Sequence, residues 1–192
     1  PRAMPDGIGG MRAVAARGSD PASSLEGLRI GVVHNPRSGA NLKAAAAMRR
    51  TFSAHPEIPC RDASEPDEVA QVLREMAQHG VNTVAISGGD GTVCAVLNTV
   101  FGANPFPGLP LLAVLRGGTA NMTAGDIGMR GRHNRALRRL IECAGRGGEG
   151  LTVIERPVMR IDPGAGRSPI YGMFFGAAAI SQGIAYCKRH VH

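Results

Sequence analysis

The sequence predicts an α/β protein: a parallel three-layer α/β domain followed by the start of a β-rich (β-sandwich) second domain. Three observations support this prediction. Short apolar runs alternate with segments of helical spacing, each run is nearly continuous in apolar residues, and the alternation stops after Gly150. Strands that are apolar throughout are typical of parallel sheets covered by helices on both faces.

The composition fits one globular domain and part of another. The 192 residues are 43% hydrophobic and 19% charged, and they include 27 Gly and 13 Pro. A chain of this size can bury ~70% of its unfolded surface, so its core needs no disulfide or metal. The lack of Trp and the 4% aromatic content argue against a stacking platform for single-stranded nucleic acid.

The four cysteines are scattered along the chain, without a CxxC pair or neighbouring histidines at metal-ligand spacing. Scattered cysteines in apolar surroundings are typical of reduced core residues. The sequence therefore predicts a reducing compartment, a cytoplasmic location and no structural zinc.

The first element of the α/β domain follows a segment without periodicity. Residues 1–27 mix Gly, Ala, Pro, Ser and Arg, so we expect a flexible N-terminal extension there. The α/β domain is expected at 28–148. It opens with a strand at Leu28–His34, a loop at Asn35–Gly39 and an Ala-rich helix at Leu42–Ala54.

The second helix carries its own start and stop signals. Ser64 and Asp67 form a capping-box pattern with Ser64 as the N-cap. Apolar residues then recur at helical spacing from Val69 to Met76, which predicts one buried face. Gly80 stands where a left-handed residue would end the helix.

Two further strand–helix units complete this domain. Strands are predicted at Val81–Ser87 and Leu111–Leu115, and helices at Val93–Phe101 and Asn134–Ala144. Because helices separate the strands, the strands are expected to run parallel.

The last segment, 149–192, is predicted to be the beginning of a second, β-rich domain that is incomplete. Strand-like runs occur at Leu151–Ile161 and Ile170–Phe175 without a helix between them. The uncharged run Ser168–Cys187 is about long enough to span a bilayer. Its Pro, Gly, Ser and Gln content favours a buried strand over a transmembrane helix.

The net charge of +7 comes entirely from the last third of the chain. Residues 1–128 hold eleven basic and eleven acidic side chains, whereas 129–192 hold eleven basic and four acidic ones. A local positive field would concentrate nucleotide, nucleic acid or an anionic membrane surface. A general preference for Arg, which supplies 20 of the 22 basic residues, explains the excess equally well.

Three of the predicted strands end in small polar loops that contain Gly: Asn35–Gly39, Gly88–Thr92 and Gly117–Asn121. The carboxyl ends of parallel strands lie along one edge of a sheet, and ligands of open α/β sheets bind outside that edge. We therefore expect the three loops to lie together and to form a binding site.

The loop Gly88–Thr92 has the composition of a phosphate-binding turn. Its glycines permit positive φ, and successive inward N–H groups then form an anion-binding nest. Thr92 opens a helix whose N-terminal amides and dipole favour phosphate. A carboxylate there repels phosphate unless a cation or proton intervenes, so Asp90 is interpreted as a Mg²⁺ ligand or general base. A tight turn with an Asx cap is the alternative for this loop, but it leaves the other two loops unexplained.

The motifs Asn35-Pro-Arg-Ser-Gly39, Gly88-Gly-Asp-Gly-Thr92 and Gly118-Thr-Ala-Asn121 occur in this order. Together they resemble the catalytic domain of the diacylglycerol kinase and lipid kinase family, which includes sphingosine kinases and bacterial lipid kinases. The resemblance runs from about Leu28 to the end of the chain. Neither a Walker A motif nor a GxGxxG fingerprint occurs, and GxSxG is also absent.

The resemblance implies transfer of the γ-phosphate of ATP, with Mg²⁺, to a lipid hydroxyl such as that of diacylglycerol. ATP would lie between the α/β domain and a C-terminal β-sandwich. The lipid substrate would be met at an anionic membrane surface, by a cytoplasmic protein peripheral on the inner membrane face. Asp90 matches the family's functional aspartate, serving the metal or the lipid hydroxyl. The implied nucleotide-binding residues come from all three loops: Asn35, Ser38, Gly39, Gly88, Gly89, Gly91, Thr92, Gly118, Thr119 and Asn121.

Three positions depart from the family pattern. Ala95 stands where the family usually has Glu, Thr99 where it has Gly, and Met122 where it has Asp, although Asp126 is near. The family's second-domain acidic motif falls beyond residue 192. The chain alone is therefore expected to bind nucleotide without turning over.

Other functions stay open at this point. NAD kinases share GGDGT, so an NAD kinase-like enzyme is one alternative, ranked lower because of the other two loops. A non-catalytic nucleotide- or lipid-binding module is another, suggested by Ala95 and Met122. Nucleic-acid binding through Arg130–Arg139 is disfavoured. The sequence determines neither the lipid nor the oligomeric state.

Overall fold

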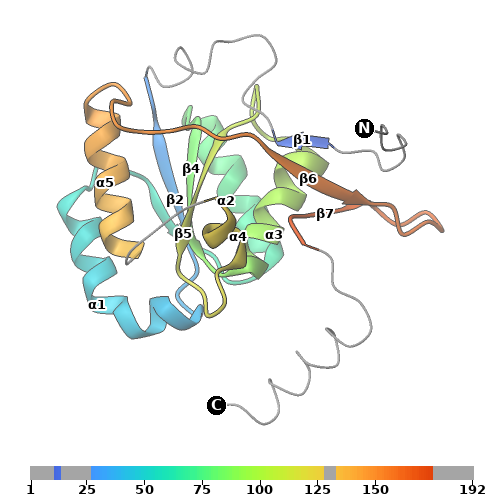
Figure 1. Cartoon of the computed structure of the whole chain (residues 1–192), viewed down its shortest axis with the longest axis horizontal. Coiled ribbons are helices and arrows are strands. Elements are labelled where there is room, and N and C mark those ends of the chain that lie inside the picture. Colours follow the sequence, from blue (N-terminus) through green and yellow to red (C-terminus); the bar gives the residue numbers. More distant parts are fainter. Residues whose placement is uncertain (1–10, 14–26, 128–132, 175–192) are drawn as a thin grey trace, which may run out of the picture.

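The computed structural model describes residues 11–13, 27–127 and 133–174 (Figure 1). Its central sheet has four parallel strands in the order β3-β2-β4-β5. Helices cover both faces of this sheet, as the α/β prediction requires. The strands are β2 (Ile30–His34), β3 (Cys60–Asp62), β4 (Thr83–Gly88) and β5 (Leu111–Arg116).

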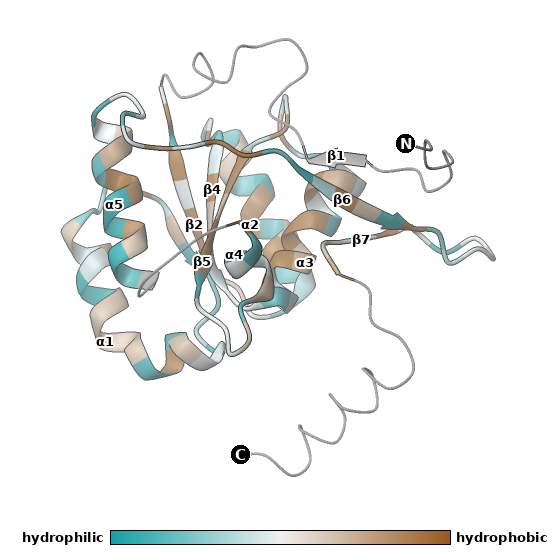
Figure 2. Cartoon of the chain, in the orientation of Figure 1, coloured by the Kyte–Doolittle hydropathy of each residue, from teal (hydrophilic) through white to brown (hydrophobic). Residues whose placement is uncertain are grey.

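Two helices lie on each face of the sheet. In Figure 1, α1 (Gly39–Ala54) and α5 (His133–Gly145) lie to the left of the strands, with α2 (Pro66–Gln78) and α3 (Asp90–Asn98) on the other side. Alternation along each strand supplies both cores. Val32 packs with the α1/α5 core, whereas its neighbour Val33 packs with the α2/α3 core. Figure 2 shows this distribution of hydropathy: hydrophobic (brown) residues of the strands lie inside, and hydrophilic (teal) residues lie on the outward faces of the helices.

Several helix boundaries differ from the predicted ones. Helices α1 and α3 begin at Gly39 and Asp90, three residues earlier than expected, so part of each polar loop is helical. Helix α3 continues into a π-helical turn, η2 (Thr99–Ala103), which stops at Asn104 with φ 38°. A short helix, α4 (Met122–Asp126), follows the loop after β5.

Helix α2 starts one residue later than predicted. Its N-cap is Glu65, and its capping box pairs Glu65 with Glu68 instead of Ser64 with Asp67. Pro66 is the reason, because proline favours the first helical position and holds the preceding residue in extended backbone. At the other end, Gly80 has the predicted left-handed conformation, with φ +71°.

A second, antiparallel sheet has the order β1-β6-β7. It contains β6 (Arg156–Ile161) and β7 (Ile170–Gly172), which are shorter than the two predicted runs. Strand β1 (Met11–Ala13) pairs with β6, although no strand was predicted within 1–27. Residues 1–10 and 14–26 of that predicted extension, Phe175 and most of Ser168–Cys187 lie outside the described residues. Among the described helices, none has the length and apolarity that crossing a membrane requires.

The capping box of α2 makes stability depend on pH through Glu68. Its carboxylate accepts the N–H groups of Ser64 (2.7 Å) and Glu65 (3.1 Å). These bonds, with a smaller contribution from Arg37, lower its pKa below the usual 4.5. A lowered folded-state pKa means that the stabilisation is present above about 4.5 and is lost as the pH falls through the folded-state value.

We therefore expect Glu68→Gln to be less stable than the wild type at pH 7, and this deficit to be smaller at about pH 3. Urea unfolding at both values measures this, because protonated Glu and Gln carry the same charge. A stability difference that stays constant between the two pH values would contradict the assignment.

Candidate functional site

The three predicted loops lie together at the carboxyl edge of the central sheet, in the lower centre of Figure 1. The Asn35 amide donates to Thr92 Oγ1 (3.0 Å), and the Gly89 N–H donates to Ser38 Oγ (3.3 Å). The Gly117 carbonyl accepts the N–H of Ala40 (3.1 Å). Each loop is thus bonded to another. We call this edge, residues 35–41, 88–92 and 117–123, the rim.

Most glycines of the rim are required by close contact and not by positive φ. None of Gly88, Gly89, Gly91 and Gly118 has positive φ, so the predicted nest is wrong in its backbone geometry. A Cβ on Gly118 would lie 2.4 Å from Gly89 Cα. A side chain at Gly118 would therefore push the loops after β4 and β5 apart.

Close contacts also explain the glycines at two other predicted site residues. A Cβ on Gly39 would lie 2.6 Å from Thr119 Oγ1, and one on Gly88 would lie 2.4 Å from Thr92 Oγ1. Gly91 differs, since it is exposed and a Cβ there would meet nothing within 4 Å. Packing within the described residues does not explain the glycine at Gly91.

Asn41, in the first turns of α1, was missed by the sequence analysis and lies at the centre of the rim. It is fully buried. Its amide nitrogen donates to the carbonyls of Asn35 and Ser87, both at 2.8 Å, and its oxygen accepts the Ser87 hydroxyl (3.3 Å). One side chain thus joins the ends of β2 and β4. Asn41 stands just before the helix predicted at Leu42–Ala54, so no pattern in the sequence marked it.

Asp90, the first residue of α3, connects the second loop to the third. Its Oδ2 and Oδ1 accept the N–H groups of Met122 (3.1 Å) and Thr123 (2.9 Å). The carboxylate therefore caps the short helix α4 and is fixed in direction. Each oxygen can accept a further bond, so capping α4 leaves lone pairs on both oxygens for a ligand.

A single carboxylate suits only some metal sites. In the described part of the chain, no three His, Cys, Asp or Glu side chains are grouped so as to hold a metal. Mg²⁺ usually binds one or two carboxylates together with substrate phosphates and waters. Asp90 therefore fits Mg²⁺ that arrives with a nucleotide.

Asn121 shapes the third loop. Its carboxamide oxygen accepts the Gly118 N–H, and its nitrogen donates to the Gly118 carbonyl, both at 2.8 Å. Its backbone is left-handed, with φ 54°, which Asn tolerates better than most residues. Thr119 lies exposed at the tip of this loop and touches Gly39.

A cleft of about 300 Å³ opens between the first two loops and the start of α2. Ala95 and Val69 give it an apolar wall. At the N-terminus of α2, the N-cap Glu65 forms an ion pair with Arg37 (2.6 Å), and both side chains are exposed. The remaining lining residues are mostly polar or glycine: Asn35, Ser38, Ser64, Pro66, Gly89, Gly91 and Thr92.

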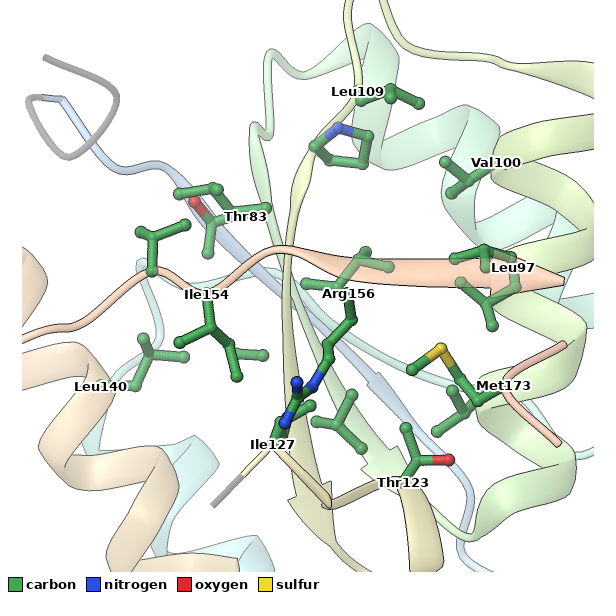
Figure 3. A pocket seen from close by; sticks show the side chains of 18 of the residues that line it. Thr83, Leu97, Val100, Leu109, Thr123, Ile127, Leu140, Ile154, Arg156 and Met173 are labelled. Carbon is green, nitrogen blue, oxygen red and sulfur yellow. The ribbon is translucent and has the colours of Figure 1, made fainter. Parts of the chain in front are cut away.

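A second pocket, of about 230 Å³, is apolar and lies beside β5, an edge strand of the sheet (Figure 3). Its lining comes from both cores, with Leu97 on one side and Leu140 on the other. Arg156 projects into it and pairs with Asp126 (Nε–Oδ2 3.0 Å). None of the predicted site residues lines this pocket.

A third hollow, beside β3, contains His34 and Cys60. Burial, assisted by Asp62, raises the pKa of the Cys60 thiol to about 12. The thiol is therefore protonated near neutral pH and is not a candidate nucleophile.

A family model described as "Diacylglycerol kinase catalytic domain" matches residues 29–147, more than half of the chain. No curated protein matched the sequence.

Solved structures give a more distant similarity. One, described as "a putative diacylglycerol kinase from Bacillus anthracis str. Sterne", is 22% identical, with a TM-score of 0.49 over 59% of this chain and 41% of that chain. Another, described as a diacylglycerol kinase from the same organism, is 22% identical, with a TM-score of 0.48 over 59% of this chain and 42% of that chain. The chain therefore spans less than half the length of these two proteins.

The contact between the loops predicts opposite effects for two Gly→Ala substitutions. Gly118→Ala is expected to lower the free energy of unfolding by about 1–3 kcal/mol, because the new methyl group clashes with Gly89. Gly125→Ala, in α4, meets nothing within 4 Å and should be neutral or stabilising. Denaturant unfolding of both variants measures this. Equal effects would show that the loops do not touch.

Asn41→Ala should destabilise the protein by roughly 2–4 kcal/mol, because it leaves the Asn35 and Ser87 carbonyls without their buried donor. Lys43→Ala, an exposed change on the same helix, is the control and should stay within about 0.5 kcal/mol. Unfolding free energies from urea titration decide it. Asn41→Ala that is as stable as the control would refute the central role of this side chain.

Proposed function

The chain belongs to the diacylglycerol kinase catalytic-domain family, and we propose that it binds ATP at the rim and provides the nucleotide site of an ATP-dependent lipid kinase. The enzyme would transfer the γ-phosphate to a lipid hydroxyl such as that of diacylglycerol. One observation carries the proposal: three loops, far apart in sequence, are bonded into a rim beside a polar cleft, with one fixed carboxylate.

The first turn of α3 is the proposed phosphate site. The first N–H groups of a helix have no partner within the helix, and its dipole attracts anions. Gly89, Gly91 and Thr92, at the start of α3, line the cleft. The Gly89 and Thr92 N–H groups already donate to Ser38 Oγ and the Gly89 carbonyl. Phosphate groups in the cleft would therefore meet the Gly91 N–H and the Thr92 and Ser38 hydroxyls. Gly118, Thr119 and Asn121 would close the site from the third loop.

Asp90 is proposed to act where the phosphoryl group is transferred. The lipid hydroxyl oxygen forms a bond to the γ-phosphorus, the bond from that phosphorus to the β–γ bridging oxygen breaks, and ADP leaves with the electron pair. Asp90 either accepts the hydroxyl proton or would help to hold Mg²⁺, in which case the proton passes to water or to a phosphate oxygen. Bound Mg²⁺ would neutralise charge on the phosphates. Hydrogen bonds from α4 keep the carboxylate in one direction for either role.

We propose that residues 28–148 form the nucleotide-binding domain and that 149–192 begin the domain that meets the lipid. The exposed Arg135, Arg138 and Arg139 on α5 would face an anionic membrane from its cytoplasmic side. Neither a nucleic-acid partner nor an oligomeric state is part of the proposal.

A non-catalytic nucleotide-binding module is the second candidate. Ala95 lines the cleft without a charge, and Met122, beside Asp90, is 56% exposed. This candidate predicts saturable ATP binding without transfer by the full-length protein.

The proposed function is tested with the full-length protein, Mg²⁺, γ-labelled ATP and vesicles that contain diacylglycerol. We expect labelled lipid from the wild type and a loss of about 100-fold or more in Asp90→Asn, because the fixed charge is removed. Nucleotide affinity should change less than about tenfold, since the backbone N–H groups remain. Asp67→Asn is the matched control, because Asp67 also lies in the first turn of a helix and is exposed.

A wild-type rate in Asp90→Asn, at unchanged thermal stability, would refute the role of Asp90. Formation of NADP from NAD, with no labelled lipid, would favour the NAD kinase-like alternative. ATP binding without transfer to either acceptor would favour the module.

A further inference from the structure

Asn98, the last residue of α3, holds the backbone of a strand in the second sheet. Its Oδ1 accepts the Tyr171 N–H (2.9 Å), and its Nδ2 donates to the Tyr171 carbonyl (2.9 Å). These are the two bonds that a residue of a neighbouring strand would make. Asn98 therefore takes the place of a further strand beside β7.

The surroundings keep this carboxamide in one orientation. Its Nδ2 also donates to the Cys94 carbonyl, one turn back along α3 (2.7 Å). The Cys94 thiol donates to the Tyr171 carbonyl (3.4 Å). An amide has one accepting and one donating end, so a flipped side chain would lose these bonds.

Tyr171 is also fixed by its ring. The residue is only 7% exposed, and its ring stacks on Phe101 with centroids 5.6 Å apart. Met173, two residues on, packs against the α2/α3 core and projects into the pocket of Figure 3 near Leu97. Strand β7 is thus attached to α3 by backbone, ring and side-chain contacts, and Asn98 supplies the directional ones.

The opposite end of α3 belongs to the rim. Asp90 and Thr92 lie in its first turn, and Asn98 ends it about 12 Å away, at ~1.5 Å per residue. A single short helix therefore connects the rim to the second sheet. Because β7 is bonded to the last residue of this helix and Asp90 is its first residue, the helix sets the distance between β7 and Asp90.

We propose that Asn98 is a positioning residue that sets the second sheet, and with it the acceptor hydroxyl, relative to Asp90. This inference rests on the proposed lipid kinase function, and it adds a residue outside the rim and the cleft. Asn98 touches neither nucleotide nor acceptor in this proposal. Its loss should lower transfer while leaving nucleotide binding intact, which a residue of the nucleotide site would not do.

The test uses Asn98→Asp and Asn98→Ala in the full-length protein. Asp keeps the shape of the side chain but places a negative oxygen opposite the Cys94 and Tyr171 carbonyls. Ala removes the bonds to the Tyr171 N–H, the Tyr171 carbonyl and the Cys94 carbonyl without adding repulsion. Gln78→Glu is the matched control, because Gln78 is also the last residue of its helix and is exposed. It makes the same amide-to-carboxylate change near the C-terminal end of a helix, on a side chain outside the rim and the second sheet.

Three measurements separate the possible results. Hydrogen exchange of peptides that cover Ile170–Met173 reports on the clamp, by which we mean the hydrogen bonds between Asn98 and the Tyr171 backbone. This measurement does not depend on activity. Titration with ATP and Mg²⁺ reports the nucleotide site. Initial rates against diacylglycerol vesicles give kcat and KM for the acceptor.

We expect exchange in Ile170–Met173 to rise at least tenfold in both variants, with ATP affinity within about threefold of the wild type. The value of kcat/KM for the acceptor should fall at least tenfold, more in Asn98→Asp than in Asn98→Ala. The control should match the wild type in all three measurements.

Each other result overturns the inference. Unchanged exchange would mean that no clamp exists, and faster exchange with unchanged kcat/KM would mean that the clamp does not position the acceptor. Unfolding of both variants would make Asn98 a residue of general stability. A wild type that labels no lipid would defeat the proposed function, and the catalytic half of this inference with it, while the exchange data would still decide the clamp.

Discussion

The contact between the loops after β4 and β5 is the constraint on which the candidate site depends. Gly89 and Gly118 approach so closely that a Cβ on Gly118 would lie 2.4 Å from Gly89 Cα. This distance brings Asp90 within reach of the N–H groups at the start of α4. A side chain that forced these two loops apart would move the start of α4 away from Asp90, although the Gly117 carbonyl would still bind the third loop to the N–H of Ala40.

Most of the fold follows from patterns that are local in the sequence. Apolar runs and helical spacing predict β2, β4, β5 and the four long helices, because burial on one or both faces dictates residue type directly. Strand β3 escapes such a pattern, since its three residues, Cys60–Asp62, are exposed or only partly buried. The start of α2 was predicted one residue early, because the effect of Pro66 on Glu65 outweighs the capping preference of Ser64.

The candidate site was predictable in its loops but not in its contacts. Parallel strands place Asn35, Asp90 and Thr119 at one edge, so their convergence follows from topology alone. The reason for the glycines does not, because it depends on a contact between Gly89 and Gly118, 29 positions apart. Asn41 was missed for the same reason: its partners lie on two strands, and no periodicity marks it.

Helix α3 gives these separate features a common frame. Its first residue caps α4, its first turn faces the cleft, and its last residue holds β7. Preorganised groups assist a reaction because they need no rearrangement when charge develops. Asp90 receives its fixed direction from α4, and Asn98 gives the same to β7. In the proposed function, this short helix, bonded at both ends, would connect the nucleotide site with the acceptor site.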